Sequence, residues 1–356
     1  MTHAVDTAQN EREREVLQAL STIQDPDLHR DIVALGFIKN LAIKDSAVSF
    51  TIELTTPACP VRDQMLESGK SVVSRLPWVT EVSVEMTAQT VSGRRNAAGE
   101  LIPGVKNVFA IASGKGGVGK STTSVNVAMA LAQTGARVGL LDGDIYGPNV
   151  PLMMGIKERP QLHGEEGRIE PMMAYGVKLM SIGFFIDEDN PVIWRGPMVH
   201  GAMQQFLRDV VWGDLDYLVI DLPPGTGDAP LSLAQLIPLS GVVIVTTPQD
   251  VALQDVAKGM AMFRKLEVPL IGVVENMSYF ICPNCDEHHE IFGQGGGERI
   301  SKHFGVPFLG KIPLQPRVRQ GGDSGQPVVM THPDSAEAQA FAGVAKAIAA
   351  QVSILA

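Results

Sequence analysis

The chain has 356 residues, of which 45% are hydrophobic, and this is enough material for two domains with cores of their own. A formal net charge of −10 argues against nucleic acid or an anionic membrane as a general partner, and no apolar run approaches the roughly 18 residues of a membrane span. With no visible signal peptide and only three cysteines, too few for a disulfide framework, we expect a cytoplasmic protein with neither a membrane nor nucleic acid as partner.

The first part of the chain has the pattern of a small α+β domain. Apolar residues at helical spacing predict a helix over residues 11–23, and a second helix is expected around residues 61–76. Alternating apolar and polar residues predict half-buried strands at 47–54 and 79–84.

This small domain holds a candidate site. Its acidic turn at residues 25–27 and the loop around Cys59 resemble the small domain of metal-sulfur cluster assembly proteins, in which these two segments lie close together. The resemblance implies that Cys59 accepts or steadies a metal or a cluster. A lone cysteine is otherwise more often a small buried hydrophobe, and this alternative stays open.

A polar, glycine-containing linker follows. We place the small domain at residues 1–91, the linker at 92–106 and a second domain at 107–356. After the linker, apolar strands alternate with helical stretches, a pattern typical of an α/β fold with a doubly wound, mostly parallel sheet.

The second domain begins with a phosphate-loop motif. Residues 114–121 match G-x-x-x-x-G-K-[ST] in full, and an apolar strand before them and a helix after them favour a phosphate site over a chance glycine-rich turn. Backbone N–H groups and the positive end of the helix surround the phosphates, Lys120 reaches the β and γ phosphates, and Ser121 ligates Mg²⁺. The predicted nucleotide ligands in this loop are Gly114, Lys115, Gly116, Gly117, Val118, Gly119, Lys120, Ser121 and Thr122.

Two later strands end in carboxylates. The segment 138–144 ends in the pair Asp142 and Asp144, and the strand 217–221 ends in Asp221. Ligands of parallel sheets bind at the carboxyl ends of the strands, so these side chains should face the phosphates. We expect Asp221 and Asp142 in the outer shell of Mg²⁺ and Asp144 to position the attacking water. Capping of the next loop or helix is the alternative.

The lysine at position 115, together with the Asp-Gly-Asp run 142–144 and the stretch 221–228, resembles the deviant Walker A ATPases, a class that includes MinD, ParA and the nitrogenase iron protein. The resemblance implies that Lys115 crosses a dimer interface to the phosphates of the partner. The alternative is that this lysine only adds local positive potential.

A cysteine pair lies far downstream. Thiols spaced as in Cys282 and Cys285 can face one metal, and thiolates favour zinc or iron–sulfur centres. A redox dithiol is one alternative, although Pro283 and the flanking aromatic residues favour a knuckle between short strands. Zinc held with His288 and His289 is another. A third is a two-fold dimer in which two pairs hold one [4Fe-4S] cluster.

Motifs along nearly the whole chain resemble the Mrp/ApbC iron–sulfur cluster carriers, and bacterial members have the same kind of N-terminal domain. The resemblance implies a homodimeric, slow ATPase that uses Mg²⁺, holds a [4Fe-4S] cluster on Cys282 and Cys285, reads the purine edge with Asn276, and has apo iron–sulfur proteins and cluster assembly scaffolds as partners. Trp194 and Arg195 match the family pattern, with a structural turn as their default role. The matching segments are the phosphate loop, 141–149, 194–198, 212–217, 221–228 and 276–278.

Two other functions share parts of these motifs. A positioning or partitioning ATPase of the MinD/ParA kind would need a basic amphipathic tail or a basic surface. The stretch 336–352 instead has Phe341, Val344 and Ile348 on one side and only Lys346 as a cation, which predicts a packing helix. A zinc-knuckle interaction module would explain the cysteines but not the acidic strand ends.

Overall fold

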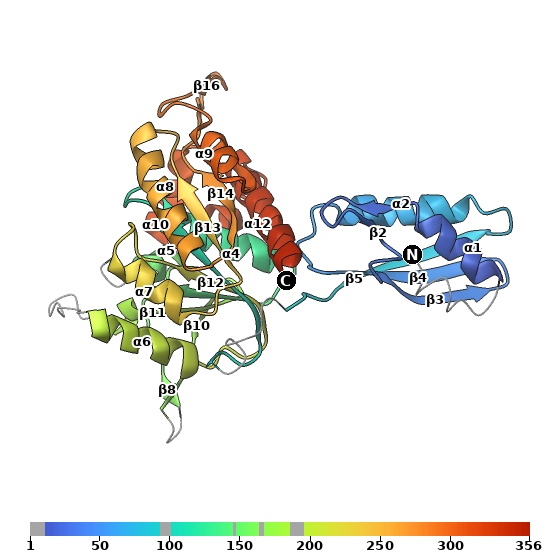
Figure 1. Ribbon diagram of the computed structural model, residues 1–356, viewed down its shortest axis with the longest axis horizontal. Helices are drawn as coiled ribbons and strands as arrows, with labels where there is room; N and C mark the ends of the chain where they lie inside the picture. Colours follow the sequence, from blue (N-terminus) through green and yellow to red (C-terminus); the bar gives the residue numbers. More distant parts are fainter. Residues whose placement is uncertain (1–10, 93–100, 145–146, 164–166, 186–195) are drawn as a thin grey trace. The chain divides into compact units, whose positions relative to one another are not determined.

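The structure of the protein is a computed structural model that describes residues 11–92, 101–144, 147–163, 167–185 and 196–356 (Figure 1). The chain divides into two compact units. The first runs to Val91 and includes Ala349–Ile354, and the second contains Ser92–Ile348 and the last two residues of the chain.

The first unit is a small α+β domain, as the sequence predicts. Helices α1 (Glu11–Leu20) and α2 (Arg62–Ser74) pack with a three-stranded sheet of β3 (Ile38–Lys44), β4 (Ala47–Leu54) and β5 (Glu81–Ala88). Strands β3 and β4 are antiparallel, whereas β4 and β5 are parallel. The parallel pairing requires a crossover, and α2 provides it.

Alternation along β4 fixes the core of this unit. Val48, Phe50, Ile52 and Leu54 project from one face of the strand and are buried with the apolar side of α1. Between α1 and β3, the chain forms a short hairpin of β1 (Gln24–Asp25) and β2 (Arg30–Asp31).

The second unit is built on an eight-stranded sheet in the order β10-β11-β7-β12-β6-β13-β14-β17. Neighbouring strands are parallel throughout, except that β10 runs antiparallel to β11 at one edge. The predicted doubly wound, mostly parallel sheet is therefore confirmed. Its strands are β6 (Val105–Ser113), β7 (Val138–Asp142), β10 (Met172–Ala174), β11 (Val177–Ser181), β12 (Leu215–Asp221), β13 (Gly241–Thr246), β14 (Leu270–Glu275) and β17 (Phe308–Lys311).

Helices cover both faces of this sheet (Figure 1). Helix α4 contacts α5 and α11, whereas α6 to α9 contact one another in turn; right-handed crossovers put these two sets on opposite faces. Because both faces are covered, the central strands are continuous apolar runs, and every residue of β12 is buried. The helices are α4 (Lys120–Gln133), α5 (Val150–Met153), α6 (Gly196–Arg208), α7 (Asp228–Leu236), α8 (Asp250–Lys265), α9 (Gly296–Phe304), α10 (Pro316–Ser324), α11 (Val328–Thr331) and α12 (Ala336–Leu355).

By length and mean hydropathy, one helix in the described part of the chain, α12, would suffice to cross a membrane, which the sequence analysis did not expect. Packing accounts for its composition, because Phe341, Val344 and Ile348 are each at most 1% exposed. Val344 lies close enough to β17 that a Cβ added to Gly310 would come within 3.0 Å of it. The predicted packing helix is thus confirmed.

Candidate functional site

The phosphate loop joins the carboxyl end of β6 to the first residue of α4, as the motif predicts. Gly117 and Gly119 have φ angles of +80° and +81°, in the left-handed region that glycine adopts without steric cost. Close approach also excludes larger residues, because a Cβ on Gly114 would lie 2.5 Å from the backbone nitrogen of Val256. The loop therefore needs glycine for its conformation and for its packing.

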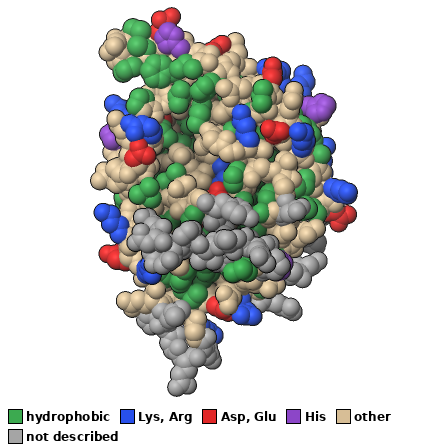
Figure 2. All heavy atoms as spheres, turned by 90° about the vertical axis from the view of Figure 1, so that its left-hand side faces the viewer, with side chains coloured by type: hydrophobic (Ala, Val, Ile, Leu, Met, Phe, Trp, Pro, Cys, Tyr) green, Lys and Arg blue, Asp and Glu red, His purple; other side chains and the backbone are tan. Residues whose placement is uncertain are grey.

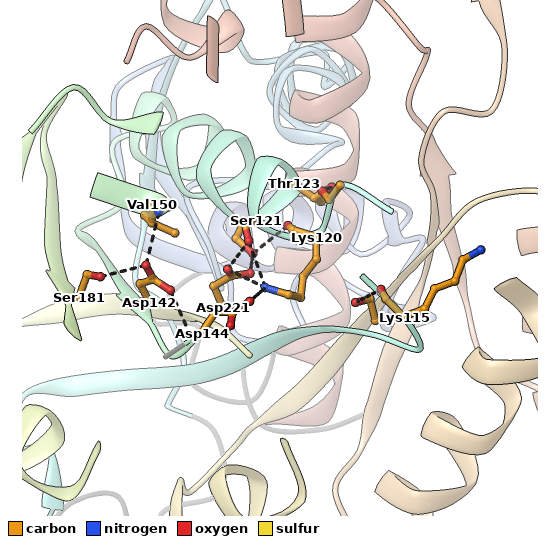
Figure 3. A network of polar contacts seen from close by, with 12 residues as sticks. Lys115, Lys120, Ser121, Thr123, Asp142, Asp144, Val150, Ser181 and Asp221 are labelled. Atoms are coloured by element: carbon orange, nitrogen blue, oxygen red, sulfur yellow. Dashed lines mark hydrogen bonds and ion pairs between the residues drawn. The ribbon is translucent and has the colours of Figure 1, made fainter. Parts of the chain in front are cut away.

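Lys120 lies at the centre of a buried polar network (Figure 3). Its Nζ is 2.7 Å from Oδ2 of Asp221, and the Ser121 hydroxyl donates to the same oxygen at 2.6 Å. The other carboxylate oxygen accepts a hydrogen bond of 2.6 Å from Ser124 Oγ. Asp221 is fully buried, so its charge is matched by the ammonium group and by hydroxyl donors. A hydroxyl beside a carboxylate is an oxygen-donor set that suits Mg²⁺.

Asp142 occupies the neighbouring strand end. In the sheet register it pairs with Asp221 of β12 on one side and Ser181 of β11 on the other. Its carboxyl group accepts hydrogen bonds from Ser181 Oγ at 2.9 Å and from the Asp144 backbone N–H at 3.1 Å. Burial, together with the charge of Asp221, raises the pKa of Asp142 to about 8. Burial in this environment therefore favours the protonated form of the carboxyl group.

Asp144 is a second carboxylate near the lysine. Its Oδ2 is 3.8 Å from Lys120 Nζ, so this ammonium group has two carboxylate neighbours, with Asp221 as the closer partner. The side chain of Asp144 is 12% exposed. The structure thus brings Lys120, Ser121 and the three predicted aspartates together at one edge of the sheet.

Lys115 lies apart from this network. Its backbone carbonyl accepts a hydrogen bond from Ser113 Oγ at 3.0 Å, and Figure 3 shows its side chain extending away from Lys120 and Asp221. The direction of the side chain leaves its ammonium group on the outer side of the phosphate loop.

A cavity of about 390 Å³ opens beside the start of α4. Asn276 lines it, and the Asn276 amide Nδ2 donates to the Val118 carbonyl at 2.8 Å. Gly119 leaves space for this amide, because a Cβ there would lie 2.1 Å from Asn276 Nδ2. The opposite wall, which the sequence analysis did not identify, consists of Pro313, Leu314, Gln315, Val318 and Arg319. The cavity adjoins Thr122, so its position suits the base and sugar of a nucleotide whose phosphates lie on the loop.

The cysteine pair lies in the turn of a small hairpin, formed by β15 (Phe280–Ile281) and β16 (His288–His289). The predicted knuckle between short strands is therefore confirmed. The Cys282 backbone N–H donates to the Glu287 carbonyl at 3.0 Å, and hydrogen bonds from the Asn284 backbone and from Cys285 lower the pKa of the Cys282 thiol. Cys285 is exposed, and the hairpin lies at the upper edge of the face in Figure 2.

The two histidines of this hairpin contact aromatic side chains. The ring of His288 stacks on Tyr279 with centroids 5.1 Å apart and planes 5° from parallel. In the described ranges, no group of three or more His, Cys, Asp or Glu side chains could hold a metal ion. In this conformation the two cysteines and the two histidines of one described chain do not form such a group.

In the small domain, Cys59 is half-buried and packs against the hydrophobic core. The acidic turn is ordered by Asp25, whose carboxylate accepts the backbone N–H groups of Asp27 and Leu28 at 2.9 and 2.8 Å. Burial and the adjacent Asp25 raise the pKa of Asp27. A metal or cluster at Cys59 stays a prediction. Trp194, Arg195 and residues 145–146 lie outside the described residues.

Residues 104–349 match the family described as NUBPL iron-transfer P-loop NTPase. The chain belongs to this family. Residues 13–84 match a second family, described as iron-sulfur cluster assembly protein, so the predicted combination of the two kinds of domain is confirmed.

Individual proteins agree with this assignment. The iron-sulfur cluster carrier protein of Synechocystis is 51% identical over 349 residues, covering 96% of this chain and 98% of the relative. A nucleotide-binding protein of Archaeoglobus fulgidus, solved in complex with ADP, has a TM-score of 0.57 at 38% identity and covers 64% of this chain and 90% of its own. The cell division ATPase MinD of Pyrococcus furiosus shares the fold alone, at 24% identity and a TM-score of 0.52, covering 68% of this chain and 98% of its own.

Proposed function

We propose that the protein is a cytoplasmic, ATP-hydrolysing carrier that binds one [4Fe-4S] cluster between two copies of the chain and transfers it to apo iron–sulfur proteins. The observation that carries the proposal is the union, in one domain, of a phosphate loop with its acidic strand ends and an exposed pair of thiols. In this assignment residues 107–356 form the ATPase domain, and residues 1–91 form a small domain that meets cluster assembly scaffolds or acceptors.

The phosphate site supports binding and hydrolysis of MgATP. The loop N–H groups and Lys120 stabilise negative charge as it develops on the phosphates, and Ser121 with Asp221 forms the metal side of the site. Asp144, 3.8 Å from Lys120 Nζ, positions the attacking water. The cavity next to Asn276 receives the base. Asp142, in which burial favours the protonated form, orders the strand end. It would contact Mg²⁺ only through water molecules of the outer shell.

The hairpin supports a shared cluster. Each chain offers two thiols and no adjacent histidine ligand within the described residues, whereas a [4Fe-4S] cluster takes four cysteine thiolates. A two-fold axis next to the hairpin would supply the other two, because an isologous contact repeats the same patch. The outward direction of Lys115 favours the same dimer, in which this lysine reaches the phosphates of the partner.

Metal analysis of anaerobically purified protein tests the proposal. We expect four iron atoms and four sulfides per two chains, a visible charge-transfer absorption and a dimer by light scattering. Cys282→Ala and Cys285→Ala should lose all three, while Cys59→Ala, the matched control outside the hairpin, should keep them. A complete cluster on each monomer, or full zinc occupancy in a monomer, would contradict the shared site.

A further inference from the structure

Two segments that are far apart in the sequence lie side by side between the nucleotide cavity and the cysteine hairpin. One follows β14 and leads directly into Cys282, and the other follows β17 and leads into α10. Hydrogen bonds join them at successive positions. These run from Ile312 N to Glu275 O (2.9 Å), from Ser278 N to Ile312 O (3.0 Å), from Leu314 N to Tyr279 O (2.7 Å) and from Gln315 Nε2 to Ile281 O (3.3 Å).

Both segments also form walls of the cavity. Asn276 and Met277 line it from the first segment, and residues 313–315 line it from the second. On its far side, Asn276 holds the carbonyl of Val118 in the phosphate loop at 2.8 Å. A base in this cavity would therefore contact the two segments that support the root of the hairpin.

Gln315 lies where these features meet. This residue lines the cavity, and its side-chain amide donates to the carbonyl of Ile281, the residue directly before Cys282. Beyond Ile281 these backbone hydrogen bonds lie within the hairpin, since the Cys282 N–H donates to the Glu287 carbonyl and the Cys282 carbonyl accepts from the Asp286 N–H at 2.9 Å. Among the described residues, the Gln315 amide thus makes the last hydrogen bond between the cavity wall and the strand that leads into Cys282.

We propose that Gln315 is a positioning residue that couples occupation of the nucleotide cavity to the orientation of the cysteine pair. The inference rests on the proposed function, because a carrier in which nucleotide controls transfer needs a connection between the nucleotide site and the cysteines that hold the cluster. A nucleotide that shifts residues 313–315 moves the Ile281 carbonyl with them, and the short hairpin follows as a unit. A ligand can bias an equilibrium only by its differential contacts with the two states, and Gln315 supplies such a contact.

Thiol alkylation in the cluster-free protein tests this coupling without iron or an acceptor. In a Cys59→Ala background, only the pair at 282 and 285 reacts, because the chain has three cysteines. We expect saturating Mg·ADP to change the alkylation rate by about fivefold, the equivalent of one hydrogen bond made or lost. Gln315→Ala, and Gln315→Glu, which keeps the volume but removes the donor, should bring the ratio of rates with and without ADP close to one.

Gln339→Ala is the matched control. Gln339 also donates from its side-chain amide to a backbone carbonyl, that of Pro333 at 2.9 Å, and it does not line the cavity. This variant should keep the full effect of ADP. Each variant is compared at its own saturating ADP concentration, established by calorimetric titration.

Two results would overturn the inference: an alkylation rate in the parent that ADP leaves unchanged, or an ADP effect that survives in both Gln315 variants. Neither depends on iron. If the metal analysis finds no bound cluster, the carrier proposal is refuted and the alkylation result stays valid. If the parent binds a cluster and its alkylation rate responds to ADP, but the Gln315 variants respond equally, only the role of Gln315 is refuted.

Discussion

Replacing Asp142 by asparagine should change how the stability of the ATPase domain depends on pH. Asp142 is fully buried, and this burial, together with the charge of Asp221, raises its pKa from an ordinary value of 3.8 to about 8. Because the folded pKa lies above the unfolded one, the folded state binds the proton more tightly between these values. The free energy of unfolding should therefore fall as the pH rises from about 4 to about 8.

The magnitude follows from the size of the shift. Each unit corresponds to about 1.4 kcal/mol, so a shift from 3.8 to about 8 corresponds to at most about 6 kcal/mol between the two ends of the range. Asparagine fits the same contacts as the protonated acid. Its carbonyl can accept from the Asp144 N–H, and Ser181 Oγ, which donates to Oδ2 of the carboxylate, becomes the acceptor of the side-chain amide, as it would of the acid proton. Asp142→Asn should be more stable than the parent, and the difference should grow by at least about 1 kcal/mol between pH 5 and pH 8.5.

Urea denaturation at pH 5, 7 and 8.5, without nucleotide and followed by circular dichroism and tryptophan fluorescence, measures the difference. Ser181→Ala is a useful companion, because it removes the hydroxyl partner at 2.9 Å while leaving the carboxyl group in place. It should destabilise at every pH by about 1–3 kcal/mol. Equal pH dependence in the parent and in Asp142→Asn would refute the argument that the proton is held in the folded state.

Other changes test the remaining assignments. Lys120→Ala should lower ATP turnover by at least about 100-fold, measured as phosphate release, because the ammonium group stabilises transition-state charge. Asp144→Asn should bind ATP with similar affinity by calorimetry but hydrolyse it far more slowly; turnover at the parent rate would remove this residue from water positioning. Lys115→Ala should retain the cluster but lose the change in transfer rate that MgATP produces in the parent, with transfer measured as activation of an apo-acceptor. Identical rates for parent and variant, each with and without MgATP, would show that ATP does not control transfer in this assay. Burial raises the pKa of Asp216, but hydrogen bonds from Arg137 and Lys106 outweigh this effect and hold the pKa at about 2. Asp216→Asn should therefore lower the free energy of unfolding by about 1–2 kcal/mol at pH 7 and by much less below pH 3, measured by thermal unfolding. An equal loss at both pH values would count against the ionic contribution.

The sequence predicts those parts of the fold in which local pattern and tertiary structure agree. The runs that became β6, β7 and β12 are buried on both faces, so their apolar composition identifies them without further information. Strand β3 was missed. It is half-exposed, interrupted by a register shift between Lys39 and Ala42, and contains Asn40 at a φ of +51°, so the alternation that identifies strands is weak there.

The candidate site likewise has some residues that the sequence predicts and others whose role depends on the folded structure. Lys120, Ser121 and the strand-end aspartates follow from short motifs, because a phosphate site needs them at fixed spacing. The cavity wall at 313–315 has no such motif, since its role comes from pairing with the segment before Cys282. The proton on Asp142 was likewise not foreseeable, because it depends on the register that places Asp221 and Ser181 on either side.

The contrast between the two sites has a physical reason. In the proposed function Lys120 and Asp221 act on developing charge, and burial of the phosphate network suits this role because electrostatic interactions are stronger where water is excluded. A cluster that is to be transferred would need the opposite environment, and Cys285 is exposed at the end of a hairpin whose strands have two residues each. So short a hairpin is not stable by itself. Its orientation must therefore come from the contacts at its root, namely the ring stack of Tyr279 on His288 and the hydrogen bonds to residues 312–315. These contacts leave Cys285 exposed, and in the proposed dimer they would let the ATPase domain determine how the two cysteine pairs meet.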